Sequence, residues 1–180
     1  EIYTLSLHDA LPISSLAPTV KNWVSILERS GIIYILHPYY AKATKRLVKT
    51  PKVYFMDTGL AAYLTRWPSA DTLENGNAAG AFFETYVVTE ILKSYMNVGV
   101  EIDLYYYRDI NRKEIDLLMV QGNTLYPIEI KKSKNPSDPD KNLKVLDKFK
   151  MEVKPMLILC MTNELIPYNR DAWLCPISVI

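Results

Sequence analysis

The chain has 180 residues, of which 49% are apolar, and its formal net charge is +1. This length suffices for one medium domain or two small ones, and the near-neutral charge excludes an overall attraction to nucleic acid or membranes. No apolar run approaches the roughly 18 to 20 residues that span a bilayer, and no signal-peptide pattern is present. Cys160 and Cys175 lack metal-ligand spacing. We therefore expect a reduced, soluble, cytoplasmic protein without membrane contact.

Residues 1–14 do not fit the pattern of a domain start. They resemble the peptide obtained when a sequencing adapter is translated in frame with a truncated gene. We therefore expect a foreign or disordered segment, in which His8 and Asp9 carry no function.

A helix followed by two strands is predicted next. Ser15 or Thr19 can cap the helix, Pro18 suits its first turn, and Gly31 ends it. Residues 32–36 and 52–56 predict paired strands. The apolar positions that recur at helical spacing are Val20, Trp23, Val24 and Leu27.

The connection between these strands is basic and contains no acidic residue. A helix followed by a two-stranded wing with a basic tip resembles the second half of a winged-helix domain, which implies contact with a DNA backbone. The alternative is a solvated surface loop. The predicted nucleic-acid-binding residues are Lys42, Lys45, Arg46 and Lys49, with Lys52 at the end of the same segment.

Asp57 and Thr58 precede an apolar helical run, so Asp57 is predicted to cap a helix, with a catalytic role as the alternative. Residues 67–77 are rich in Pro, Ser, Asp, Asn and Gly and predict a loop or linker.

Residues 80–96 predict the clearest helix, apolar over most of its circumference. Glu84 lies within this apolar surface, so it is either at the rim, extended to water, or buried with a metal or a lysine. Glu90 has the same two interpretations. The principal stripe is Phe83, Val87, Ile91 and Tyr95.

Residues 114–120 and 124–131 predict a β-hairpin around a turn at residues 121–123. Alternation places Glu129 and Lys131 on one face of the second strand. Asp116 lies on the paired strand, where it could come close to that face. Two carboxylates and a lysine would suit a divalent metal and its activated water, whereas the alternative is an ordinary exposed ion pair.

The remaining elements complete an α/β arrangement. Predicted are a strand at 104–108, a turn at 109–112, a loop at 132–141, a helix at 142–150 and strands at 156–161 and 173–179.

The order Phe83-Glu84, Tyr106-Tyr107-Arg108, Ile115-Asp116, then Ile128-Glu129-Ile130-Lys131 resembles the PD-(D/E)XK nuclease superfamily. More closely, residues 15–180 resemble the C-terminal region that follows the P-loop module in a group of prokaryotic AAA-type ATPases. The shared features include the Thr-Val-x-x-Trp helix and the run from Pro51 to Leu60.

The superfamily resemblance implies that Asp116 and Glu129 hold Mg²⁺, that Glu84 assists, and that Lys131 orients or deprotonates the attacking water. The superfamily's proline-aspartate pair is represented here only by Ile115-Asp116. No P-loop motif is present, so ATP is expected only in an absent ATPase module.

The resemblance implies an α/β fold in which a partial winged helix precedes a restriction endonuclease-like mixed sheet flanked by helices. The expected function is that of a C-terminal fragment of an AAA-type ATPase that binds or cleaves DNA with Mg²⁺. The alternative is a catalytically inactive module that binds DNA or protein and regulates the ATPase. The expected units are a foreign segment at 1–14, a winged-helix-like remnant at 15–67, a linker at 68–79 and a nuclease-like domain at 80–180.

Overall fold

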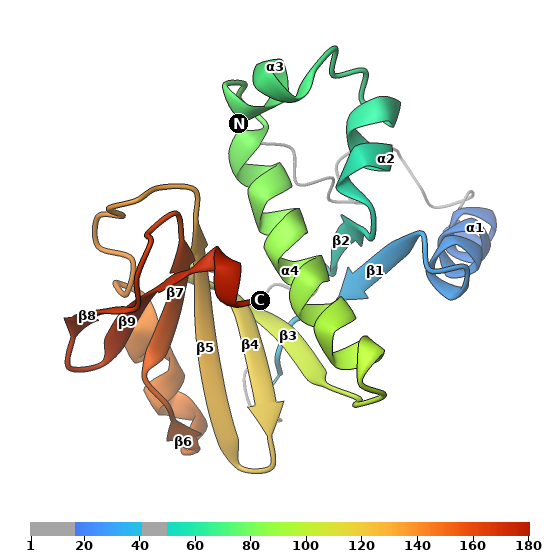
Figure 1. Cartoon of the computed structure of the whole chain (residues 1–180). Helices are drawn as coiled ribbons and strands as arrows, with labels where there is room; N and C mark the ends of the chain where they lie inside the picture. Colours follow the sequence, from blue (N-terminus) through green and yellow to red (C-terminus); the bar gives the residue numbers. More distant parts are fainter. Residues whose placement is uncertain (1–16, 41–49) are drawn as a thin grey trace.

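The computed structural model describes residues 17–40 and 50–180. In this part of the chain a mixed sheet of seven strands is flanked by helices, which confirms the predicted α/β class (Figure 1). Residues 1–14 and the basic residues Lys42, Lys45, Arg46 and Lys49 lie outside the described residues. The predictions made for them, and the predicted domain boundaries, stay predictions.

The first unit is helix α1 (Ala17–Arg29) followed by the antiparallel pair β1 (Ile33–Leu36) and β2 (Lys52–Phe55). Pro18 lies in the first turn, where its missing N–H costs nothing. Gly31 follows the helix with a φ of 68°, a left-handed conformation that glycine adopts readily. The predicted helix and strand pair are confirmed. Thr19 lies inside the helix and does not cap it, and the other predicted cap, Ser15, lies outside the described residues.

Helix α2 (Thr58–Leu64) begins at a cap formed by Asp57, as predicted. The Asp57 carboxylate accepts a hydrogen bond of 2.6 Å from the backbone N–H of Leu60. A Cβ at Gly59 would lie 3.0 Å from the same carboxylate oxygen, so a glycine leaves room for the cap.

The stretch predicted to be a linker contains a short helix, α3 (Ala70–Glu74). Ser69 and Thr72 form a capping box, in which each side chain accepts a hydrogen bond from the backbone N–H of the other. The loop prediction was wrong here because residues typical of turns are also those that cap helices.

Helix α4 (Ala79–Asn97) matches the helix predicted at 80–96. Val87, Val88 and Ile91 are buried, and Phe83 and Tyr95 pack beside them. The broad apolar surface predicted from sequence is therefore the face that covers the sheet.

The main sheet combines an antiparallel and a parallel half. Strands β3, β4 and β5 form an antiparallel meander, β5, β7 and β9 run parallel, and β8 closes the far edge antiparallel to β9. The short β6 also pairs with β5. The bounds are β3 (Asp103–Arg108), β4 (Glu114–Gln121), β5 (Thr124–Lys131), β6 (Glu152–Val153), β7 (Met156–Cys160), β8 (Ile166–Asn169) and β9 (Ala172–Pro176).

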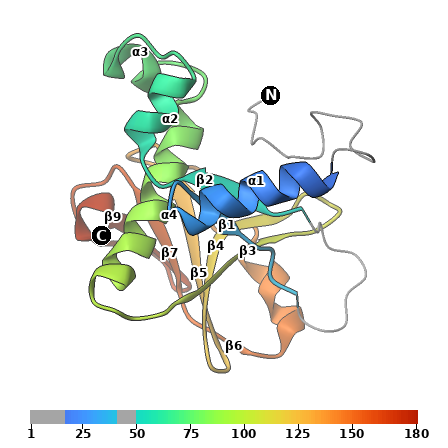
Figure 2. The ribbon, with the colours of Figure 1, turned by 90° about the vertical axis from the view of Figure 1, so that its right-hand side faces the viewer.

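Each face of the sheet is covered by a different helix, as Figures 1 and 2 show. On one face α4 packs with Leu36 of β1 and Tyr54 of β2 over Leu117, Ile128 and Ile130. On the other face the 3₁₀ helix η1 (Leu143–Phe149) buries Leu146 and Phe149 against Tyr107, Ile115, Leu118, Leu125 and Ile158. The two buried clusters hold β4 and β5 at the centre of the molecule.

Three details differ from the predicted elements. The helix expected at 142–150 is a 3₁₀ helix. The strand expected at 173–179 ends at Pro176 and continues as the 3₁₀ turn η2 (Ile177–Val179). Strands β6 and β8 were not predicted. None of the helices in the described ranges is long and apolar enough to cross a membrane.

We expect Asp57→Ala to lower the free energy of unfolding by about 1 kcal/mol, because the cap of α2 is lost. Asp57→Asn keeps an acceptor oxygen and should retain most of the stability. Urea unfolding of the two variants and the wild type measures this difference. Equal stability of Asp57→Ala and wild type would contradict the capping role.

Candidate active site

Strand β4 carries a bulge at Asp116 and Leu117, two residues that lie opposite the single residue Tyr106 of β3. The extra residue breaks the alternation of side chains along the strand. Leu117 is therefore buried on the α4 face directly beside Asp116, although neighbouring residues of a regular strand face opposite ways. The pairs on either side of the bulge are Tyr105 with Leu118 and Tyr107 with Ile115.

Asp116 lies where β4 and β5 separate. Their regular pairing extends from Gln121 and Thr124 to Leu117 and Ile128, and stops there. Beyond this point the backbone N–H of Ile130 donates a hydrogen bond of 2.9 Å to Asp116 Oδ2. The carboxylate thus takes the place of a strand carbonyl, which fixes its position.

Lys131 joins Asp116 to Glu129. Its Nζ lies 2.6 Å from Glu129 Oε1 and 3.5 Å from Asp116 Oδ2. Glu129 is buried, with 5% of its surface exposed, and its second oxygen, Oε2, has no hydrogen-bond partner in the described structure. A buried carboxylate oxygen without a partner is costly, so this atom is a candidate for binding a cation.

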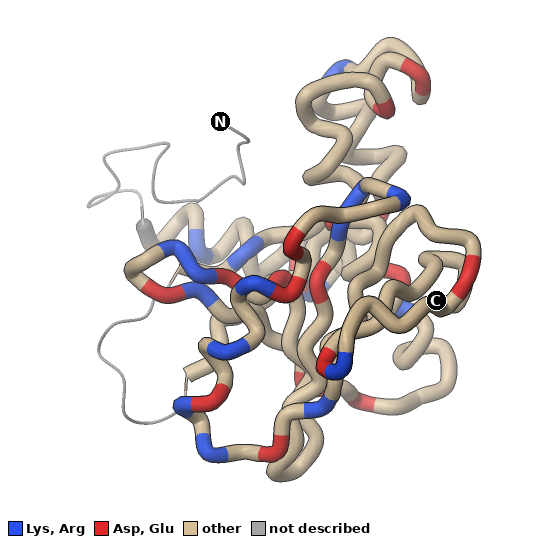
Figure 3. The backbone as a smooth tube through the Cα atoms, turned by 90° about the vertical axis from the view of Figure 1, so that its left-hand side faces the viewer, with Lys and Arg blue, Asp and Glu red and all other residues tan. Residues whose placement is uncertain are grey.

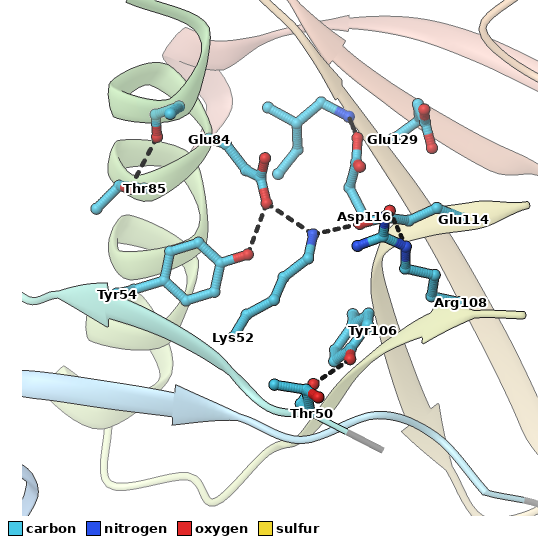
Figure 4. A network of polar contacts seen from close by, with 12 residues as sticks. Thr50, Lys52, Tyr54, Glu84, Thr85, Tyr106, Arg108, Glu114, Asp116 and Glu129 are labelled. Carbon is cyan, nitrogen blue, oxygen red and sulfur yellow. Dashed lines mark hydrogen bonds and ion pairs between the residues drawn. The ribbon is translucent and has the colours of Figure 1, made fainter. Parts of the chain in front are cut away.

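Glu84 of α4 lies on the other side of Asp116 and has its own partners (Figure 4). Its Oε1 accepts a hydrogen bond of 2.6 Å from the Tyr54 hydroxyl and one of 2.9 Å from the Lys52 ammonium. The same ammonium lies 2.6 Å from Glu114 Oε1. Arg108 Nε approaches Glu114 Oε2 at 3.5 Å, which completes a chain of alternating charges.

The pKa values of Asp116 and Glu129 are both raised. For Glu129, burial is the main cause and the charge of Asp116 the second, and together they outweigh Lys131 and raise the pKa from 4.5 to about 7. For Asp116, burial and the charge of Glu84 outweigh Lys131 and Lys52. The positive charge near these two acids is too small to offset their burial and the neighbouring negative charge.

The pKa of Glu84 is lowered and that of Lys52 is raised, and both shifts favour the charged forms of an ion pair. Burial opposes ionisation of Glu84, but the Lys52 ammonium and the Tyr54 hydroxyl outweigh it and hold the pKa below its usual value. Burial likewise disfavours the Lys52 ammonium, but Glu84, Glu114 and other nearby groups raise its pKa well above the usual value. Glu84 and Lys52 are therefore both charged at neutral pH.

The structure thus brings Asp116, Glu129 and Lys131 together and places Glu84 beside Asp116 without direct contact to Glu129. Figure 4 shows the Glu129 carboxylate pointing away from Glu84. Across residues 17–40 and 50–180, no group of three or more His, Cys, Asp or Glu side chains is placed to hold a metal ion. The predicted roles of the four residues stay predictions. Glu90 forms a partly exposed ion pair with Lys93 at the surface of α4.

Sequence reasoning missed the contributions of Lys52, Tyr54 and Glu114 to this cluster. A signal was present, because Lys52 and Tyr54 alternate along β2 and so lie on one face of that strand. Their partner Glu84 is 32 residues from Lys52 in sequence, and only the packing of β2 on α4 shows the pairing.

Residues 79–180 match a family described as a domain of unknown function (DUF4143), which accounts for more than half of the chain. The chain belongs to the DUF4143 family. Such domains typically lie at the C-terminus of AAA-type ATPases, which confirms the wider part of the resemblance drawn from sequence. Residues 7–71 match a second domain of unknown function (DUF8612). Glu84, Asp116, Glu129 and Lys131 all lie in the DUF4143 domain, whereas Lys52 precedes it.

Two curated relatives are similar to the chain over part of their length. They are the uncharacterised proteins Rv2008c of Mycobacterium tuberculosis and Mb2031c of Mycobacterium bovis, each 29% identical over 119 residues. The match covers 66% of this chain and 26% of each relative, so the chain spans about a quarter of their length. No solved structure gave a significant match.

The raised pKa of Glu129 predicts how stability changes with pH. Between 4.5 and about 7 the folded state binds more protons at this residue than the unfolded chain does. The free energy of unfolding should therefore fall as the pH rises through this window. In Glu129→Gln this fall should be smaller by on the order of 2 to 3 kcal/mol.

Urea unfolding of the wild type and of Glu129→Gln at several pH values between about 5 and 8 measures this change. Glu90→Gln is the matched control, because it removes a carboxylate from a partly exposed ion pair with Lys93. Identical pH profiles for the wild type and Glu129→Gln would contradict the assignment of the raised pKa to Glu129.

Proposed function

We propose that this chain is the nuclease-like C-terminal domain of an AAA-type ATPase and that it hydrolyses phosphodiester bonds in DNA with Mg²⁺. The observation that carries the proposal is the contact of one ammonium, Lys131 Nζ, with the carboxylates of both Asp116 and Glu129. It is made where the regular pairing of β4 with β5 stops and the Asp116 carboxylate accepts the N–H of Ile130.

The fold supports a restriction endonuclease-like assignment at the level of element order. Helix α4 precedes an antiparallel meander that has an aspartate on its second strand and Glu-x-Lys on its third, and parallel strands follow. The order of α1, β1 and β2 likewise supports a winged-helix-like unit before it. Both assignments are part of the proposal.

The residues fit a divalent ion in part. Asp116 and Glu129 are hard oxygen donors, and Glu129 Oε2 is buried without a hydrogen-bond partner among the described residues. Burial and neighbouring carboxylates raise the pKa of both acids, and a nearby divalent charge would relieve this repulsion. Glu84 fits less well as a third ligand, because Lys52 and Tyr54 already satisfy one of its oxygens. A bound Mg²⁺ would lower the pKa of a water ligand and stabilise charge on the phosphate.

Lys131 fits the role of a cation that binds the scissile phosphate. Burial favours its neutral form, but Asp116 and Glu129 outweigh burial and raise its pKa, so it stays protonated at neutral pH. It is therefore a poor base for water, and its charge can stabilise the negative charge that grows on the phosphate oxygens. In the reaction a water oxygen bonds to phosphorus, the bond to the leaving ester oxygen breaks, the attacking water loses a proton to solvent, and the leaving oxygen takes up a proton from solvent to give the alcohol.

We expect the purified protein to nick or cleave DNA when Mg²⁺ or Mn²⁺ is present. Asp116→Asn and Lys131→Met should each lower the rate by roughly 100- to 1000-fold, since each removes a charge that acts on the reacting phosphate. Gel assays on supercoiled, linear and branched DNA measure the rate, and circular dichroism confirms folding.

Lys93→Met serves as the control, because Lys93 lies in a partly exposed ion pair nine residues along α4 from Glu84. Cleavage at the wild-type rate by Asp116→Asn would point to a contaminating nuclease. An inactive wild type on all these DNA structures would remove the enzymatic proposal.

A second candidate function is a binding module without catalysis. Two observations favour it. Every carboxylate of the site already forms an ion pair with a lysine of the protein. Among the described residues, no three His, Cys, Asp or Glu side chains are placed to hold a metal ion. The partner would be DNA or the ATPase module of the intact protein. Figure 3 shows Lys and Arg interleaved with Asp and Glu over the described face. DNA affinity would then depend on the basic segment that includes Lys42, Lys45, Arg46 and Lys49.

In this second case DNA binding should survive Asp116→Ala and weaken steeply with salt. Four phosphate contacts predict a slope of log K against log salt of roughly −3 to −4. Fluorescence anisotropy at several salt concentrations measures the slope, and replacing the four basic residues by Ala should flatten it. A flat response of the wild type would exclude DNA as the partner.

A further inference from the structure

We propose that Lys52 is a further positioning residue of this site. Its ammonium occupies the place between Glu84 and Glu114 where a second divalent ion would otherwise bind. The inference rests on the proposed function, in which Asp116 and Glu129 hold the metal. It also means that β2, which precedes the DUF4143 domain, completes that domain's site.

The ammonium of Lys52 lies between two carboxylates that come from different elements. Its Nζ is 2.9 Å from Glu84 Oε1 on α4 and 2.6 Å from Glu114 Oε1 on β4. Figure 4 shows the side chain extending from β2 into this gap. Two carboxylates facing each other across such a gap are the donors that a divalent ion uses, and one ammonium now serves both.

The position of Lys52 is fixed by its surroundings. Only 11% of its side chain is exposed, and the ammonium lies 5.2 Å from the centre of the Tyr106 ring, a cation–π distance. The Tyr106 hydroxyl donates a hydrogen bond to the Thr50 carbonyl, two residues before Lys52. A solvated surface lysine has none of these constraints, so the alternative of an incidental ion pair is less favoured.

The four carboxylates of the site therefore form two pairs, each bound by a different lysine. Lys52 neutralises Glu84 and Glu114. Asp116 and Glu129 share Lys131, and Glu129 Oε2 has no hydrogen-bond partner in the part of the chain that the structure describes. The site should therefore take one divalent ion and not two. Lys52 acts through the carboxylates that it holds and does not contact the reacting atoms.

Counting bound Mn²⁺ ions tests this inference without any activity measurement. Electron paramagnetic resonance of free Mn²⁺ gives the number of ions bound per chain. We expect one ion for the wild type and for Lys52→Arg, which keeps the charge, and two for Lys52→Gln. The second ion should be lost again in the double variant Lys52→Gln, Glu84→Gln.

The outcomes separate this inference from the proposed function. One ion in the wild type and one in Lys52→Gln would overturn the role of Lys52 and leave the Asp116–Glu129 site in place. No ion in the wild type but one in Lys52→Gln would support Lys52 and remove the proposed metal site. No ion in either would overturn both.

If Lys52→Gln does not fold, Glu84→Gln tests the same inference, because Lys52 still holds Glu114 in that variant. It should bind Mn²⁺ with an affinity within about threefold of wild type. A loss of Mn²⁺ affinity of tenfold or more, the loss expected for Asp116→Asn, would show that Glu84 ligates the metal. It would overturn the inference that Lys52, and not the metal ion, is the partner of Glu84.

Discussion

The site depends on the hydrogen bond between the backbone N–H of Ile130 and the Asp116 carboxylate. It forms because the bulge in β4 ends the regular pairing with β5, which leaves that N–H without a strand partner on this side. The carboxylate satisfies the N–H and is thereby held where β4 and β5 separate. From there it interacts electrostatically with Glu84 on one side and Lys131 on the other.

Burial of so many charges requires that they compensate one another. Four carboxylates and three cations of the described structure meet within this network, and the cations are Lys52, Arg108 and Lys131. For the mostly buried pair of Lys52 and Glu84, removing one partner should cost about 3 to 5 kcal/mol, because the other charge is left unpaired. Within the described residues the network is therefore short of one positive charge, and this shortage falls on Glu129, whose Oε2 has no hydrogen-bond partner there and whose pKa is raised.

Much of this arrangement could be predicted from local patterns. Alternation along β5 placed Glu129 and Lys131 on one face, and the two form an ion pair of 2.6 Å. The apolar surface of α4 and the cap at Asp57 also followed from residues close in sequence. The bulge at Asp116 could not be predicted in this way, because it depends on the pairing of β4 with β3. The contact of Lys52 with Glu84 likewise depends on tertiary packing, and β8 was missed because Pro167 and its exposed neighbours do not resemble a buried strand.

The central claim is that Asp116 and Glu129 form a binding site for one divalent ion. The most direct measurement is anomalous diffraction from a crystal of the protein grown with Mn²⁺. A single anomalous peak within about 2.2 Å of an oxygen of each of the two residues is the expected result. Absence of a peak there, with the Lys131 ammonium still bound to both carboxylates, would contradict the claim.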